Sequence, residues 1–320
     1  MNDLTPLMIG TLGSEALLSG PMARRQALAA RIEAAGLDHV FIADHISFHT
    51  GIGMDGLIQA AILTTLLPAT EVCIGVYLLA LRHPVPVARQ LSTLSESAPG
   101  RVVLGVGVGG EDRHEIEICG VDPGRRGART DHCLAALEGL LSGEATDHDS
   151  DFFSFHAARI RPAPTPRIPI LIGGRADAAL ARCARFGDGW LGVWTSAARF
   201  GAAVKDINAR ADALGRPAPN AHGMQIWCGF DSEPDQARQR LATRMEGFYK
   251  VPFESFERYS PYGRPADVAA ALKPYLDAGC RRFNLMPVAA SEEAGIEAVA
   301  EVASLLRKDP DSHSPLHGRS

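Results

Sequence analysis

The most constraining feature of this sequence is a regular alternation of short apolar segments with longer amphipathic ones. Eight segments match strand patterns, at residues 7–13, 39–45, 72–81, 101–109, 168–173, 189–194, 223–230 and 282–288. Helical patterns separate nearly all of them, at residues 22–35, 57–67, 85–98, 130–141, 176–186, 199–214, 235–248, 266–278 and 292–306. Nearly continuous apolar strands that alternate with helices are typical of a parallel sheet covered by helices.

Eight such units favour an α/β fold closed into a (β/α)8 TIM barrel; an open, doubly wound sheet is the structural alternative. The alternation breaks once, between the fourth helix and the fifth strand, where residues 147–167 are rich in Asp, Phe and Pro. We predict an insertion there that passes over the barrel mouth, with a short hairpin around residues 152–160. Residues 1–308 are predicted to form one barrel domain, and the polar segment 309–320 is expected to be disordered.

Composition and charge narrow the class of partner. The chain is 46% hydrophobic, and its 32 basic and 37 acidic residues give a net charge of −5. This balance argues against a nucleic acid or an anionic membrane as the main partner. Residues 1–13 lack the basic and long apolar parts of a signal peptide, and no apolar run reaches membrane-spanning length. We expect a cytoplasmic protein that acts on a small molecule.

Metal-ligand spacings are missing from the sequence. The six cysteines form no CxxC pair, and the histidines form neither HxH nor HExxH. His49 follows His45 by four residues, but a metal site would need further ligands at a fitting spacing. We therefore predict no metal, and we expect the cysteines to be small reduced core residues.

In (β/α)8 barrels, chemistry gathers where strands end and the loops to the next helices begin. The second predicted strand ends in Asp44-His45, a hydrogen-bond acceptor beside an imidazole that can gain or lose a proton under cellular conditions. The alternative is that Asp44 only caps a loop and His45 is merely exposed.

Two glycine-rich strand ends suggest a cofactor. In the fourth strand, Gly105, Gly107 and Gly110 match GxGxxG spacing, a weak signal in the middle of a chain. Such glycines would let a flat ring approach the backbone, or they would simply fill a crowded barrel interior. The fifth strand ends in Gly-Gly-Arg at residues 173–175, directly before a helix. This segment either binds phosphate or is a plain turn. Trp190 and Trp194, in the sixth strand, either line a pocket or are buried in the barrel wall.

Five blocks, at residues 36–45, 74–94, 100–111, 126–131 and 169–190, together resemble the luciferase-like monooxygenase superfamily. The resemblance extends from residue 36 to about residue 215, and the final third matches only loosely. It implies a (β/α)8 barrel with an insertion, matching the strand count made above. It also implies an oxidoreductase with a flavin-type cofactor, either FMN or the deazaflavin coenzyme F420, and suggests a homodimer.

The resemblance further implies site residues. His45 and Asp44 would be catalytic, with His45 as proton donor or acceptor beside the ring. A non-proline cis peptide would fall near Tyr77 and Leu78. The implied cofactor-binding residues are Asp44, Tyr77, Leu78, Gly107, Gly109, Glu111, Gly173, Gly174 and Arg175. The Ala-Asp-His triplet at 43–45 and the Arg-His-Pro at 82–84 favour the deazaflavin over FMN.

Two other functions stay open at this point. One is a barrel that binds a flavin without catalysis. The other is a phosphate-handling isomerase or lyase, which a Gly-Gly phosphate loop would also suit. An aldolase of that kind would need a Schiff-base lysine at a strand end, and no lysine occurs in the eight predicted strands.

Overall fold

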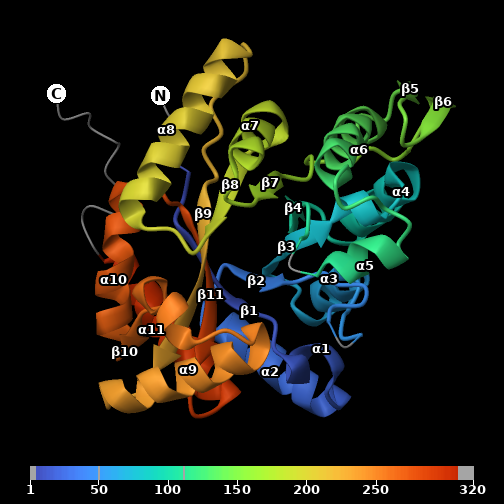
Figure 1. Cartoon of the computed structure of the whole chain (residues 1–320). Coiled ribbons are helices and arrows are strands. Elements are labelled where there is room, and N and C mark those ends of the chain that lie inside the picture. The colour runs from blue at the N-terminus through green and yellow to red at the C-terminus, as the bar shows by residue number, and fades with distance from the viewer. Residues whose placement is uncertain (1–4, 50, 111, 309–320) are drawn as a thin grey trace.

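A computed structural model describes residues 5–49, 51–110 and 112–308, and the segment 309–320, for which we predict disorder, lies outside these ranges. Within the described ranges, eight parallel strands pair in a closed ring (Figure 1). Around the ring they are β1 (Met8–Leu12), β2 (His39–Ile42), β3 (Glu71–Leu78), β4 (Val102–Gly107), β7 (Ile170–Gly173), β8 (Gly189–Val193), β9 (Gly223–Phe230) and β11 (Arg282–Val288). The pairings of β11 with β1 and of β8 with β9 complete the closure. The predicted barrel is confirmed, and the open-sheet alternative is wrong.

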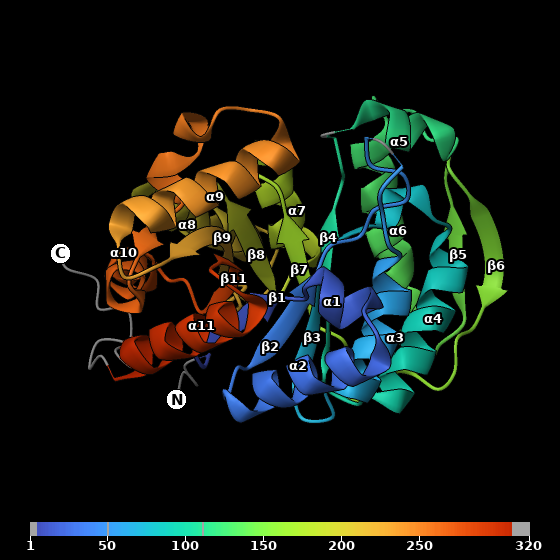
Figure 2. The ribbon, with the colours of Figure 1, turned by 90° about the horizontal axis from the view of Figure 1, so that it is seen from below.

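Helices follow the strands and cover the outside of the barrel (Figure 2). They are α1 (Glu15–Ser19), α2 (Met22–Ala34), α3 (Gly56–Leu66), α4 (Pro84–Ser97), α5 (Arg113–Ile118), α6 (Arg126–Leu140), α7 (Asp177–Phe186), α8 (Ala197–Ala213), α9 (Pro234–Tyr249), α10 (Pro265–Asp277) and α11 (Glu292–Arg307). In α4, Pro84 occupies the first turn, where its missing amide hydrogen costs nothing. Val87, Leu91 and Leu94 recur at helical spacing and bury one face of this helix.

The barrel wall separates two hydrophobic cores. Along β2, Val40 and Ile42 join the larger core that includes the surrounding helices. Phe41, between them, belongs instead to a second cluster with Cys73 of β3 and Val103 of β4. Because side chains alternate along a strand, these residues fill the interior of the barrel. The site must therefore lie at an end of the barrel.

Several element boundaries differ from the prediction. β2 ends at Ile42, so Asp44 and His45 lie in the loop that follows the strand. β3 ends at Leu78, opposite the last residue of β4, and the apolar residues after it form the short 3-10 helix η1 (Leu79–Leu81). Elements too short to show a clear period were missed from the sequence; they are α1, α5, β10 (Tyr262–Gly263) and the 3-10 helices η2 (Phe253–Ser255) and η3 (Glu257–Tyr259).

The insertion forms a hairpin of β5 (Thr146–Asp149) and β6 (Ser154–Ala158). The predicted hairpin at 152–160 missed the first of these strands, which is Asp-rich and polar. The hairpin lies on the outer side of α4 and α6 in both views and does not pass over the mouth (Figures 1 and 2). Arg89 and Ser92 of α4 donate hydrogen bonds to backbone carbonyls just after it, which holds it against that helix.

A bulge in β3 is the main irregularity of the barrel. The register with β4 moves from Ile74 opposite Leu104 to Tyr77 opposite Val106, which adds one residue to β3. The peptide between Gly75 and Val76 is cis. The cis peptide expected near Tyr77–Leu78 therefore lies slightly earlier in the chain, within the bulge.

Three glycines on the neighbouring strands make room for this bulge. A Cβ on Gly105 would lie 2.3 Å from the backbone oxygen of Ile74. A Cβ on Gly107 would lie 2.3 Å from Val76 Cγ2, and one on Gly173 would lie 2.8 Å from Val76 Cγ1. Gly105 and Gly107 of β4 thus serve close packing in a crowded interior, one of the two interpretations that the sequence left open for that strand, and Gly173 of β7 serves the same packing.

We predict that Gly105→Ala lowers the free energy of unfolding by about 1–3 kcal/mol, because its methyl group would overlap a backbone carbonyl that has no rotamer to escape to. Gly247→Ala is the matched control. A Cβ added to this glycine of α9 would have no other atom within 4 Å, so the change should stabilise the protein by about 0.5–1 kcal/mol. Urea denaturation of both variants tests the pair. Equal effects from the two substitutions would contradict the steric argument.

Candidate functional site

Asp44 is the organising residue at the end of β2. The residue is 1% exposed. One oxygen accepts from the amide of Gly56 at 2.9 Å, and the other accepts from the amide of Leu78 at 2.9 Å. Both oxygens also accept from the guanidinium of Arg82, at 2.5 and 2.8 Å. Asp44 therefore joins the start of α3, the end of β3 and the segment before α4. Its predicted contact with a cofactor stays a prediction.

Arg82 extends this network; the Arg-His-Pro at 82–84 was linked to the cofactor by resemblance, but no contact of Arg82 with Asp44 was predicted. Its guanidinium also donates to Asp55 at 2.9 Å and lies 4.3 Å from the ring centre of Tyr77. Burial works against its charge, but the hydrogen bonds with Asp44 outweigh that effect and raise the pKa of Arg82. Burial also raises the pKa of Tyr77, so its phenol stays protonated. A charged arginine thus rests on a neutral tyrosine beneath the mouth.

His45 lies at the rim with one ring nitrogen held by a carboxylate. Its side chain is 25% exposed, and Nδ1 lies 3.1 Å from Oε2 of Glu115 in α5. The other oxygen of Glu115 accepts from the amides of Ile46 at 2.6 Å and Ser47 at 3.0 Å. Because a carboxylate accepts hydrogen bonds, this contact favours the tautomer with the proton on Nδ1. The Nε2 edge of the imidazole is then available as an acceptor.

The loop after β2 is fastened to α5 and α9. Phe48 is buried, and its ring lies 4.2 Å from the imidazole of His45 and 6.0 Å from the ring of Phe248 in α9. Asp112 accepts from the amide of His49 at 2.6 Å and also caps α5. Hydrogen bonds from backbone amides lower the pKa of Asp112, and the one from His49 has the largest effect. The Asp112-x-x-Glu115 spacing suits a helix start and could have revealed α5, but nothing local shows that Glu115 reaches His45.

The predicted glycines have different surroundings. Gly107 and Gly173 face Val76, as described above. Gly109, with φ +65°, and Gly110, with φ +134°, form the turn that leaves β4. Glu111, predicted as an acidic residue near the cofactor, lies outside the described residues.

The exit of β7 has features that suit an anion. Gly174 has φ +116°, and its carbonyl accepts from the indole of Trp190 at 2.7 Å. α7 then begins at Asp177. Its N-cap residue is Ala176, which has no side chain that could accept a hydrogen bond from the first amides of the helix. Free amides at a helix start attract negative charge. Arg175 is exposed nearby and lies 5.4 Å from the ring centre of Trp194.

The predicted residues share one end of the barrel. Asp44 and His45 follow β2, and Tyr77 and Leu78 end β3. Residues 173–175 begin at the last residue of β7 and continue into the loop after it. Because the strands are parallel and in one ring, their carboxyl ends form a single rim. The structure therefore does not place His45 and the paired glycines on opposite sides of the molecule.

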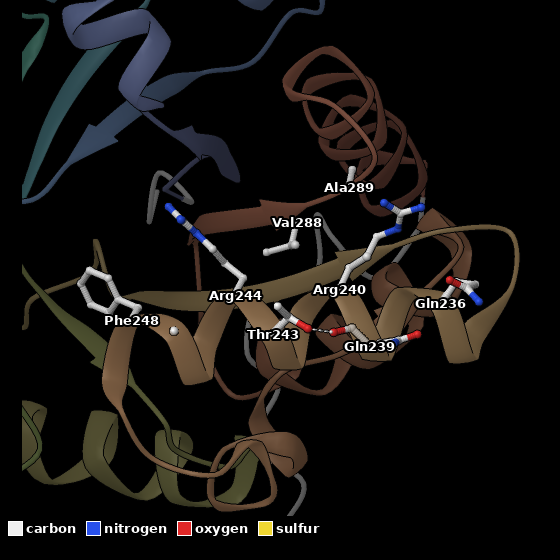
Figure 3. A pocket seen from close by; sticks show the side chains of 9 residues that line it. Gln236, Gln239, Arg240, Thr243, Arg244, Phe248, Val288 and Ala289 are labelled. Atoms are coloured by element: carbon white, nitrogen blue, oxygen red, sulfur yellow. Dashed lines mark hydrogen bonds between the residues drawn. The ribbon is translucent and has the colours of Figure 1, made fainter.

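Two adjoining cavities open on the β9–β11 side of this rim. One, of about 760 Å³, lies between α9 and the end of β11 (Figure 3). The other, of about 460 Å³, lies between the ends of β1 and β11 and the start of α11. Arg244, Val288 and Ala289 line both. This part of the rim could not be found from the sequence, because the polar side chains of α9 resemble an ordinary solvated helix face.

Other features that mark functional sites are few in the described chain. Across residues 5–49, 51–110 and 112–308, no three His, Cys, Asp or Glu side chains are grouped as metal ligands would be. No helix in those ranges has the length and apolar character needed to cross a membrane. The six cysteines are free thiols, and all but Cys119 are buried.

The sequence matches known proteins over its whole barrel. The model of the luciferase-like monooxygenase family matches residues 7–306. An uncharacterised protein of Mycobacterium tuberculosis is 37% identical over 183 residues, which cover 51% of this chain and 63% of that protein. An F420-dependent glucose-6-phosphate dehydrogenase of Beutenbergia cavernae is 35% identical over 169 residues, which cover 50% of this chain and 49% of the relative. The chain thus spans about half to two thirds of these relatives.

Solved structures show the same fold. An F420-dependent secondary alcohol dehydrogenase superposes with a TM-score of 0.81 at 19% identity, covering 97% of this chain and 100% of the other. A monooxygenase from Streptomyces bottropensis gives a TM-score of 0.76 at 18% identity, covering 94% and 98%. With the family match over residues 7–306, these findings show that the chain belongs to the luciferase-like monooxygenase family.

Proposed function

We propose that this protein is an F420-dependent oxidoreductase that moves a hydride between the deazaflavin and a small organic substrate. The observation that carries the proposal is His45, held at the barrel rim by Glu115 with its Nε2 edge available. F420 is favoured over FMN because an F420-dependent relative is 35% identical to half of this chain. The Ala-Asp-His triplet at 43–45 supports the same choice.

The exit of β7 fits the phosphate of such a cofactor. The indole nitrogen of Trp194 is buried and has no hydrogen-bond partner among the described residues. An oxygen of a phosphate would satisfy this donor. Gly174, Arg175 and the uncapped start of α7 would supply further amide and guanidinium donors.

When bound, the deazaflavin supplies the hydride acceptor or donor. The residues of this chain would manage the proton. In the oxidation of an alcohol, Nε2 of His45 would take the hydroxyl proton as the carbon gives up its hydride. Glu115 would stabilise the resulting imidazolium through Nδ1. Phe48 and Phe248 would keep water from one face of that imidazole.

Absorption titrations with F420 and with FMN test the choice of cofactor. We expect F420 to bind at least ten times more tightly than FMN, and Arg175→Ala to weaken its binding at least tenfold. Arg185→Ala is the matched control, because this arginine lies in the last turn of α7, the helix that follows Arg175, and also rests on an aromatic ring. It should leave binding unchanged.

Turnover is measured separately with bound F420 and a panel of alcohols and carbonyl compounds. Preferential binding of FMN would contradict the proposed cofactor. Tight F420 binding without turnover across the panel would instead favour a barrel that binds the cofactor without catalysis. Failure to bind either cofactor would reopen the isomerase or lyase alternative.

A further inference from the structure

The 760 Å³ cavity beside α9 has an unusual charge for this protein. Its lining comes from one face of α9 and from Val288 and Ala289 at the end of β11. The polar side chains in that lining are two arginines, two glutamines and a threonine, and none of the described lining residues is acidic. The whole chain carries a net charge of −5. This cavity is therefore a local cationic site on an acidic protein.

Arg244, on the exposed face of α9, is the cation in this lining that no described protein group neutralises. It makes no ion pair or hydrogen bond with the described residues. Arg240, one turn earlier, is tied to Asp231 at 3.4 Å. In Figure 3 both arginine side chains leave α9 on the side that faces Val288 and Ala289. A guanidinium in that position presents a planar set of donors that suits a carboxylate or a phosphate.

The cavity is connected to His45 through aromatic contacts. Phe248 lines it, and its ring lies 6.0 Å from Phe48, which in turn lies 4.2 Å from His45. Arg244 lies one helical turn, about 5 Å along the axis, before Phe248. The guanidinium and the imidazole therefore border the same side of the barrel mouth, with Phe248 and Phe48 between them.

The adjoining 460 Å³ cavity is less suited to an anion. Glu15 and Glu292 line it together with Arg244, and its remaining lining includes the apolar side chains of Leu12, Leu28 and Ile296. Those acidic groups would repel a carboxylate or phosphate on this side of Arg244. The negative group of a ligand is therefore expected on the other side of Arg244, in the first cavity, whose described lining has no acidic residue.

From these observations we propose that Arg244 forms an anion subsite for the substrate, with Arg240 as a second cation. The substrate would be an organic acid or a phosphate ester, and its reacting carbon would lie toward His45. The claim that the bound anion belongs to the substrate rests on the proposed function. The existence of the anion site does not depend on the cofactor.

Binding of inorganic phosphate to the cofactor-free full chain tests the site directly. Calorimetry at constant ionic strength should show millimolar binding that Arg244→Gln weakens at least tenfold, while Arg244→Lys retains part of it. Lys205→Gln, a change of an exposed charge on α8, should have no effect. Arg175→Ala distinguishes the exit of β7, where phosphate could also bind. Loss of binding in Arg175→Ala alone, or no loss in Arg244→Gln, would overturn the proposal.

Kinetics then test the link to the substrate. With F420 bound, Arg244→Gln should raise KM for hydroxy acids at least tenfold and leave kcat/KM for matched neutral alcohols within about twofold. An equal effect on both series would contradict a substrate role for the anion. If F420 gives no turnover at all, the proposed function fails, while the phosphate titration still decides whether the site exists.

Discussion

Replacing His45 by alanine should lower kcat by about 10²–10⁴-fold and change the affinity for F420 by less than about threefold. The imidazole is the titratable group that the structure holds at the rim with a free nitrogen edge, so its loss removes the proton acceptor but no contact that we assign to the cofactor. Stopped-flow reduction of F420 measures the first quantity, and an absorption titration measures the second. Unchanged kcat in this variant would remove His45 from the mechanism.

Glu115→Gln separates the positioning of His45 from its chemistry. The amide oxygen can still accept from Ile46 and Ser47, which preserves the loop, but the carboxylate beside Nδ1 is lost. We expect a smaller fall in kcat, about tenfold, with KM changed by less than about twofold, because the imidazolium that forms during turnover is less stabilised. A merely structural role for Glu115 would change stability and leave kcat unchanged.

Asp44→Ala should lower the free energy of unfolding by about 3 kcal/mol. The carboxylate is buried and accepts four hydrogen bonds, so its removal leaves the amides of Gly56 and Leu78 without their acceptor. It also leaves Arg82 with Asp55 as its remaining carboxylate partner. Urea denaturation of the cofactor-free protein gives the value.

Asp151→Ala is the matched control for that prediction. Asp151 also pairs with an arginine, Arg125, but its side chain is 79% exposed. Water replaces such a contact easily, so the stability should change by less than about 1 kcal/mol. If both variants lose the same small amount of stability, the network around Asp44 does not hold the loops together as we describe.

The barrel could be predicted because each of its units leaves a local signal. The apolar pattern of β2 and the helical spacing of α4 are both visible without any knowledge of the fold. Strand ends were less certain, because Leu79 and Leu81 continue the apolar run of β3 after pairing with β4 has stopped. Pairing, and not local composition, ends that strand.

The site was predictable only where its residues follow strands directly. Asp44 and His45 were found in this way, but their partners were not. Glu115 is 70 residues from His45 in sequence, and Arg82 is 38 residues from Asp44. Contacts of this kind depend on how the loops fold over one another, which has no local period. Arg244 was missed for the same reason, since only the position of α9 beside β11 makes it part of the rim.

Val76 has a consequence for how this barrel can change in evolution. Its two methyl groups occupy the space that side chains at Gly107 of β4 and Gly173 of β7 would need. A smaller residue at 76 would open that space, and alanine at either glycine could then refill it. These positions on three strands should therefore be exchanged in combination, and variants that are harmful alone should become tolerable as pairs.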